Sequence, residues 1–88
     1  MSRVQLFLEI QNERLAQDAK WGGPAHDDQH SVADWFDFIT DHAMPAVGRN
    51  DRVQLVRIAA LAVAALESLD RQSNAASEKT GKGEEQRQ

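Results

Sequence analysis

The sequence predicts an all-α protein whose fold unit is a set of three helices, and three observations support this class. Apolar residues recur every three or four positions in two segments, which is the spacing of one helix face. A third segment is apolar almost all round, as in a helix at the centre of a bundle. No segment alternates apolar and polar residues over a useful length, so no sheet is expected. With 88 residues, the chain suits one domain at most.

The first helix is predicted from Ser2 to about Lys20. Ser2 and Gln5 have the spacing of a capping box, in which each side chain accepts from the other residue's backbone amide. The glycines and proline at 22–24 suit a left-handed cap followed by a residue that cannot continue the helix. The helix presents a wide apolar stripe, formed by Val4, Leu6, Phe7, Leu8, Ile10 and Leu15.

The second helix is predicted to begin at Ser31, because Ser31 and Asp34 fit the S-x-x-D start signal. Pro45 removes a backbone hydrogen bond and crowds the preceding turn, so the helix ends near Ala43 or kinks there. Its apolar face comprises Val32, Trp35, Phe36, Ile39, Ala43, Ala46 and Val47.

The third helix is predicted from Asp51, a good N-cap residue, to about Arg71. Together with the first helix it carries more apolar surface than one copy can bury. We therefore expect a homo-oligomer, most simply a homodimer, that forms a larger helical bundle. Three helices packing alone are the alternative.

The last part of the chain has a different composition. Residues 73–88 contain no large apolar side chain and mix acids with bases, so their burial cannot offset the entropy of ordering them. The sequence thus predicts a single helical domain over residues 1–72 and a disordered polar tail over 73–88.

Composition excludes several functional classes. The chain has no cysteine, which rules out disulfides and a thiolate zinc site and suits a reducing compartment. Its formal charge is −4, and no Lys/Arg cluster is available to neutralise nucleic-acid phosphates. The longest apolar run, Ile58 to Leu66, is far shorter than the roughly 20 residues of a membrane helix. We expect a cytoplasmic protein that binds neither nucleic acid nor membrane.

A polar stretch, WGGPAHDDQH, connects the first two helices. In one interpretation it is a plain connector whose aspartates bond nearby backbone amides. In the other it is a loop that orients a small ligand, with Trp21 offering a stacking face. The candidate binding residues of this stretch are Trp21, His26, Asp27, Asp28 and His30.

An acidic stripe is predicted along the second helix, where Asp34, Asp37 and Asp41 recur at i, i+3 and i+7. His30 precedes the helix and can lean over the stripe. These four residues are candidate ligands for a divalent cation such as magnesium or manganese, since carboxylate and imidazole are suitable donors. The alternative is a solvated acidic face. The three aspartates are also candidate binding residues.

Four segments of the chain carry a resemblance to known proteins. The order NERLAQDAKWG, HDDQH, ADWFDFITDHA and LVRIAALAVAALESLDR resembles small proteins of phages and prophages, grouped loosely with the MazG-like nucleotide pyrophosphohydrolases. The resemblance covers about residues 8 to 72. It implies an all-α, oligomeric fold. The enzymes hold magnesium with E-E-x-x-E on one helix and E-x-x-D on the next, and the metal activates water against a nucleoside triphosphate.

Most of the acids that the resemblance requires are replaced in this sequence. The acidic pair falls on Asp41 and His42, and the third acid on Pro45. On the next helix the matching positions are Gln54 and Arg57, so only Asp41 remains a carboxylate. The metal site that the resemblance implies is therefore degenerate, which argues against hydrolase activity.

The expected function is that of a small phage-type, non-catalytic helical module on a degenerate MazG-like scaffold. It would bind a nucleotide or a host protein in the host cytoplasm, and in the latter case it would inhibit a host enzyme or defence system. The alternatives are a structural oligomer and a metal-dependent nucleoside triphosphate pyrophosphohydrolase that uses the relocated ligands His30, Asp34 and Asp37.

Overall fold

The computed structural model describes residues 2–80, and this part of the chain is all-α as predicted. One of its helices, α2, is a single turn that the sequence did not predict. The elements, in chain order, are α1 (Arg3–Trp21), α2 (Pro24–Asp27), α3 (Val32–Ala43), the 3₁₀ turn η1 (Met44–Ala46) and α4 (Arg52–Thr80).

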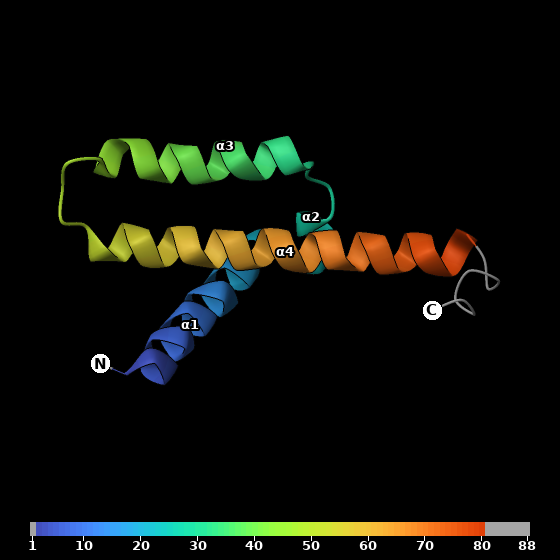
Figure 1. Cartoon of the computed structure of the whole chain (residues 1–88), viewed down its shortest axis with the longest axis horizontal. Helices are drawn as coiled ribbons and strands as arrows, with labels where there is room; N and C mark the ends of the chain where they lie inside the picture. The colour runs from blue at the N-terminus through green and yellow to red at the C-terminus, as the bar shows by residue number, and fades with distance from the viewer. Residues whose placement is uncertain (1, 81–88) are drawn as a thin grey trace.

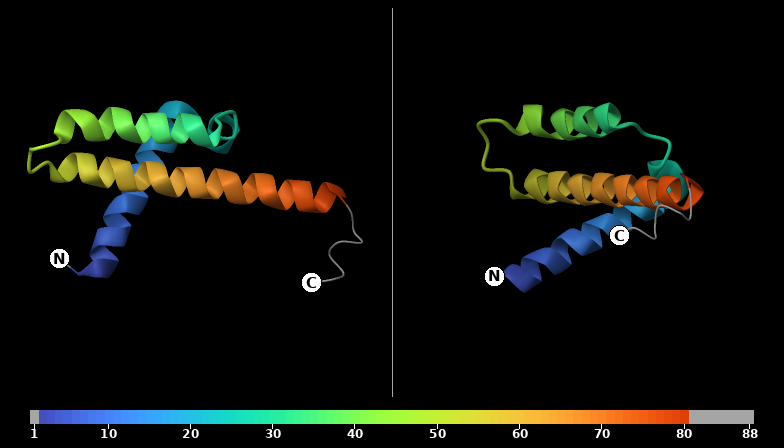
Figure 2. Two further views of the ribbon diagram at one scale, coloured as in Figure 1. Left: turned by 45° about the horizontal axis from the view of Figure 1, so that its top comes forward. Right: turned by 45° about the vertical axis from the view of Figure 1, so that its right-hand side comes forward.

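Helix α4 is the central element of the fold. Helix α3 runs alongside it in the opposite direction, and α1 crosses it on another side (Figure 1). The first half of α1 projects away from the other helices in every view, whereas α2 lies against the middle of α4 (Figure 2). A helix that is apolar almost all round can pack against two neighbouring helices. This is why α4 lies between α1 and α3 in the packing.

The predicted helix starts are confirmed. Ser2 and Ser31 both form capping boxes, in which their Oγ atoms accept from the backbone amides of Gln5 and Asp34 at 3.1 Å. Gly22 caps the C-terminal end of α1, with a φ of 110° and its N–H donated to the carbonyl of Asp18. Glycine suits this left-handed conformation because it has no Cβ to clash.

Helix α3 ends at Ala43, as the position of Pro45 predicted. The chain continues through η1, where the proline fits because the first residues of a helical turn have no intrahelical acceptor for their amides. Helix α4 then begins after Asp51, whose carboxylate accepts from the amide of Gln54 at 3.1 Å.

The predicted end of the third helix is wrong, because α4 continues beyond Arg71 to Thr80. Residues 73–80 of the predicted tail are therefore helical. Alanine, glutamate and lysine in this segment are good helix formers, and extending an existing helix needs no new nucleus. The rest of the predicted disordered tail, residues 81–88, lies outside the described residues.

The apolar core of one copy is small. Among the described apolar side chains only Trp35, Ala60 and Ala64 are buried. Many large apolar side chains of α1 and α4 stay exposed: Val4, Leu6, Phe7, Leu8, Leu15, Val53, Leu55, Leu66 and Leu69. Within residues 2–80, no helix combines the length and apolar character that crossing a membrane requires.

Candidate functional site

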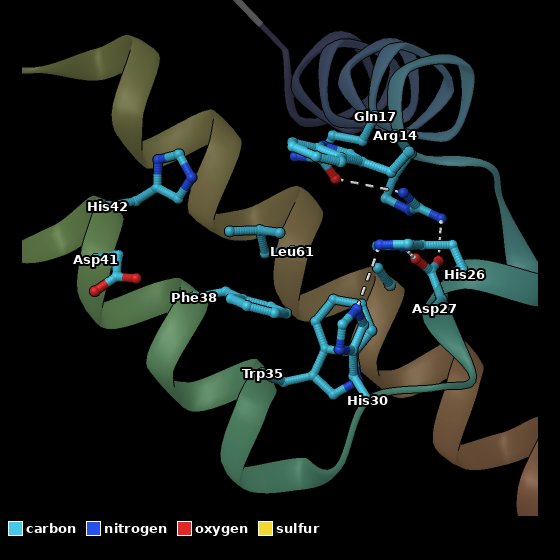
Figure 3. A pocket seen from close by; sticks show the side chains of 12 residues that line it. Arg14, Gln17, His26, Asp27, His30, Trp35, Phe38, Asp41, His42 and Leu61 are labelled. Atoms are coloured by element: carbon cyan, nitrogen blue, oxygen red, sulfur yellow. Dashed lines mark hydrogen bonds and ion pairs between the residues drawn. The ribbon is translucent and has the colours of Figure 1, made fainter.

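A pocket of about 240 Å³ opens between α1, α2, α3 and α4 (Figure 3). Aromatic rings and aliphatic groups make up most of its wall, and a few polar groups converge on it. The lining residues are Arg14, Gln17, Trp21, His26, Asp27, His30, Trp35, Phe38, Asp41, His42, Leu61 and Ala64.

A continuous series of ring contacts forms the wall near the α2 end. The rings of Trp21 and His26 stack at a centroid distance of 5.9 Å and an angle of 22°. His26 meets His30 edge-on at 4.8 Å, and His30 in turn meets Phe38 at 4.9 Å and Trp35 at 5.6 Å. These five side chains come from the end of α1, from α2 and its following loop, and from α3. The glycine and proline break at 22–24 turns the chain so that they meet.

Arg14 forms a buried ionic centre beside the rings. Its side chain is 8% exposed, and Nη2 lies 2.9 Å from Asp18, 3.3 Å from Glu67 and 3.6 Å from Asp27. Nη1 donates to Gln17 at 3.3 Å, while Nε is buried without a hydrogen-bond partner among the described residues. Three carboxylates around one guanidinium tie α1, α2 and α4 together and leave this end of the pocket with a net negative charge.

The sequence interpretation missed Arg14 as a site residue. Its role depends on Glu67, which is 53 positions away in the chain, and on Asp27, which belongs to a helix that was not predicted. A usable signal did exist. Arg14 follows Ile10 by one turn of α1 and therefore lies on the inward side of that helix, where a charged residue needs a partner.

The loop residues that were candidate ligand contacts divide into two groups. Trp21, His26, Asp27 and His30 line the pocket. Asp28 does not: it accepts from Ser68 at 2.7 Å and from Nη2 of Arg71 at 2.8 Å.

Asp28 thus fastens the segment after α2 to α4. The hydrogen bonds from Arg71, and secondarily that from Ser68, lower the pKa of its carboxyl group. Because the charged form is favoured in the folded state, this contribution to stability is present above the ordinary aspartate pKa and is lost as the pH falls through the lowered value.

The four predicted metal ligands, His30 and the three aspartates of α3, are not brought together. In the described part of the chain, no three histidine or acidic side chains converge in a way that could hold a metal ion. His30 reaches only Asp34, at 3.7 Å, and Asp37 is exposed outside the pocket. The physical reason is helical rise: positions 34 and 41 are separated by roughly 10 Å along the axis, too far for one ion.

Asp34 has a structural role at the start of α3. Its carboxylate accepts from the amide of Ser31 at 2.9 Å, and this backbone hydrogen bond is the main reason that its pKa is lowered. Asp41 lines the pocket close to His42. Of the acidic stripe, only Asp41 therefore contributes to the pocket wall.

In the described part of the chain, the positions where the sequence resemblance implied magnesium ligands do not bring together a metal-binding group. His42 and Gln54 face each other across α3 and α4, with Nδ1 and Oε1 3.1 Å apart. Arg57 lines a separate groove, together with Glu9 and Glu13. His42, Gln54 and Arg57 are not carboxylates, the side chains that magnesium prefers.

No family model matches the chain, and no curated protein or solved structure is significantly similar to it. What the fold and the comparisons establish together is a small all-α protein.

Proposed function

We propose that this protein is a non-catalytic binding module whose ring-lined pocket takes the heteroaromatic base of a nucleotide or nucleoside. The observation that carries the proposal is the wall formed by Trp21, His26, His30, Trp35 and Phe38. Base stacking on aromatic side chains contributes about 1–3 kcal/mol per base and tolerates different bases, because every base has a π-face.

The size and charge of the pocket favour the base over the phosphates. Its volume of about 240 Å³ suits one planar ring system better than a whole nucleotide. Gln17 and the carboxylates of Asp27 and Asp41 can accept hydrogen bonds from amino groups on the edge of a base. Arg14 is already surrounded by carboxylates, so phosphates would have to lie outside the pocket.

The non-catalytic part of the proposal rests on the missing carboxylates. His42 and Gln54 lie against each other where the resemblance implies acids on two neighbouring helices, so the metal site of a MazG-like scaffold would be degenerate here. We expect no release of pyrophosphate from nucleoside triphosphates in magnesium. Release that is lost in Asp41→Ala would favour the hydrolase alternative.

Trp21→Ala is expected to weaken nucleoside binding by about 1–3 kcal/mol, because it removes one face of the ring wall. Trp21 is 54% exposed, so its removal should leave the fold intact. Calorimetric titration with adenosine, guanosine, cytidine and uridine measures the effect. Phe36→Ala is the matched control, since Phe36 is an exposed ring that does not line the pocket. Equal losses in both variants, or no binding of any nucleoside to the unchanged protein, would contradict the proposal.

We also propose that the protein self-associates. The large apolar side chains exposed on α1 and α4 outnumber the apolar side chains that one copy buries. We propose that a second copy of the chain packs against these faces. A two-fold dimer buries the same patch on both chains and so forms a closed bundle. A host protein that covers the same faces is the competing occupant.

Leu8→Glu is expected to convert the assembly to monomers. Leu8 is 57% exposed and shares one face of α1 with Val4 and Leu15. A charge there costs little in a monomer but is expensive inside an apolar interface. Sedimentation velocity on the unchanged chain and the variant makes the comparison. Ala16→Glu, which adds the same charge at an exposed position of α1 that is turned away from this face, should keep the assembly. A monomeric unchanged protein would contradict this prediction.

A further inference from the structure

His26 and His30 approach each other through the same ring nitrogen, Nε2. Their Nε2 atoms lie 3.5 Å apart on the wall of the pocket (Figure 3). On the opposite side of each ring, Nδ1 faces a carboxylate: Asp27 at 3.5 Å from His26, and Asp34 at 3.7 Å from His30. The two imidazoles thus approach each other through their Nε2 atoms, and each Nδ1 atom lies near a carboxylate.

The two carboxylates favour one arrangement of the ring protons. An ionised carboxylate only accepts hydrogen bonds, so each Nδ1 that faces one should carry the hydrogen. In a neutral imidazole the remaining nitrogen, Nε2, then presents a lone pair. Two lone pairs 3.5 Å apart repel each other unless a positive species is shared between them. A metal ion satisfies both nitrogens at once, whereas a single proton requires one ring to be charged.

We propose that the Nε2 atoms of His26 and His30 chelate a divalent transition-metal ion of the zinc class. Metal-bound histidines usually donate their other N–H to a carboxylate, which orients the ring and strengthens the ligand, and both rings here have that carboxylate in place. An ion about 2.0–2.1 Å from each nitrogen would see the pair at an angle of roughly 120°, within reach of tetrahedral coordination.

The chemistry of the donors selects the metal. Imidazole suits zinc, copper and nickel, whereas magnesium and manganese prefer oxygen ligands. Because no third acidic or histidine side chain converges on the pair in the described residues, the chain supplies two ligands. The other positions belong to water or to a molecule in the pocket. This site shares His30 with the cation site that the sequence suggested, but its ligands are two imidazoles, and Asp34 only accepts from the Nδ1 side of His30.

The test is a titration of protein without a histidine tag, using zinc sulfate in competition with a fluorescent zinc indicator. The unchanged protein should bind one ion per chain, and His26→Ala and His30→Ala should each abolish most of the binding. Asp34→Asn should weaken zinc binding by about 10–100-fold, since it changes the group behind His30 but keeps an oxygen that can cap α3. His42→Ala is the control, because this third histidine contacts Gln54 and should not affect zinc affinity. Circular dichroism of each variant shows whether it is folded.

A second readout separates chelation from proton sharing. Zinc should shift the Nε2 resonances of His26 and His30 in nitrogen-detected spectra while their Nδ1 atoms keep their hydrogens. The proposal is overturned if zinc affinity is unchanged when both histidines are replaced, if the unchanged protein binds no zinc, or if Nδ1 is the atom that shifts.

Discussion

Arg14→Met should destabilise the fold by about 3–5 kcal/mol, the range observed when one partner of a buried ionic cluster is removed. Asp27 is 7% exposed and would lose the guanidinium that lies 3.6 Å from its carboxylate. Asp18 and Glu67, which are more exposed, would be left as a repelling pair near it. The loss can be measured as the change in unfolding free energy in urea.

Arg49→Met is the control for this prediction. It removes a surface pair with Asp51 at 3.3 Å, and the Arg49 side chain is 57% exposed. Exposed pairs of this kind contribute about 0.2–1 kcal/mol, so the stability should hardly change. If Arg14→Met cost no more than Arg49→Met, the ionic centre would not be holding α1, α2 and α4 together.

Trp35→Ala should cost about 3–5 kcal/mol, as is usual when a large buried ring is deleted. Trp35 is 5% exposed and contacts the rings of His30 and Phe38 edge-on. Phe36→Ala, on the next residue of α3, should cost about 0.5 kcal/mol or less, because Phe36 is 65% exposed. Urea unfolding of both variants gives the comparison, and a reversed order would show that α3 presents its other face to α4.

Local signals in the sequence predicted most of the fold. Ser2 and Ser31 begin helices because each has a capping partner three residues on. Pro45 stops α3 because its backbone nitrogen has no hydrogen to donate. These effects act within a few residues, so no tertiary information is needed. The central place of α4 likewise follows from its apolar character on all sides.

The parts that the sequence did not predict depend on distant contacts or on weak preferences. Helix α2 has only four residues, too few for a periodic pattern to appear. Arg14 becomes a site residue only when the fold brings Asp27 and Glu67 to it. The end of α4 was misplaced because a segment without large apolar residues can still extend a helix that tertiary packing has already started.

The candidate site was predicted only in part, because the orientation of its side chains also depends on contacts between distant parts of the chain. The polar stretch between α1 and α3 was identified from its composition, and the pocket does use Trp21, His26, Asp27 and His30. The sequence did not show which side chains of this stretch and of α3 face the pocket. Asp28 is held by Arg71 of α4, and the aspartates of α3 are spread along the helix instead of converging.

A single NMR titration tests the binding proposal most directly. Isotope-labelled protein is titrated in magnesium buffer with each of the common nucleosides and then with the matching triphosphate, while phosphorus spectra follow the ligand. We expect the indole N–H signals of Trp21 and Trp35 and the amides of residues 26–30 to shift with both ligand forms, and the triphosphate to remain uncleaved. Absence of shifts at these residues at millimolar ligand would contradict the binding site, and release of pyrophosphate would contradict its non-catalytic character.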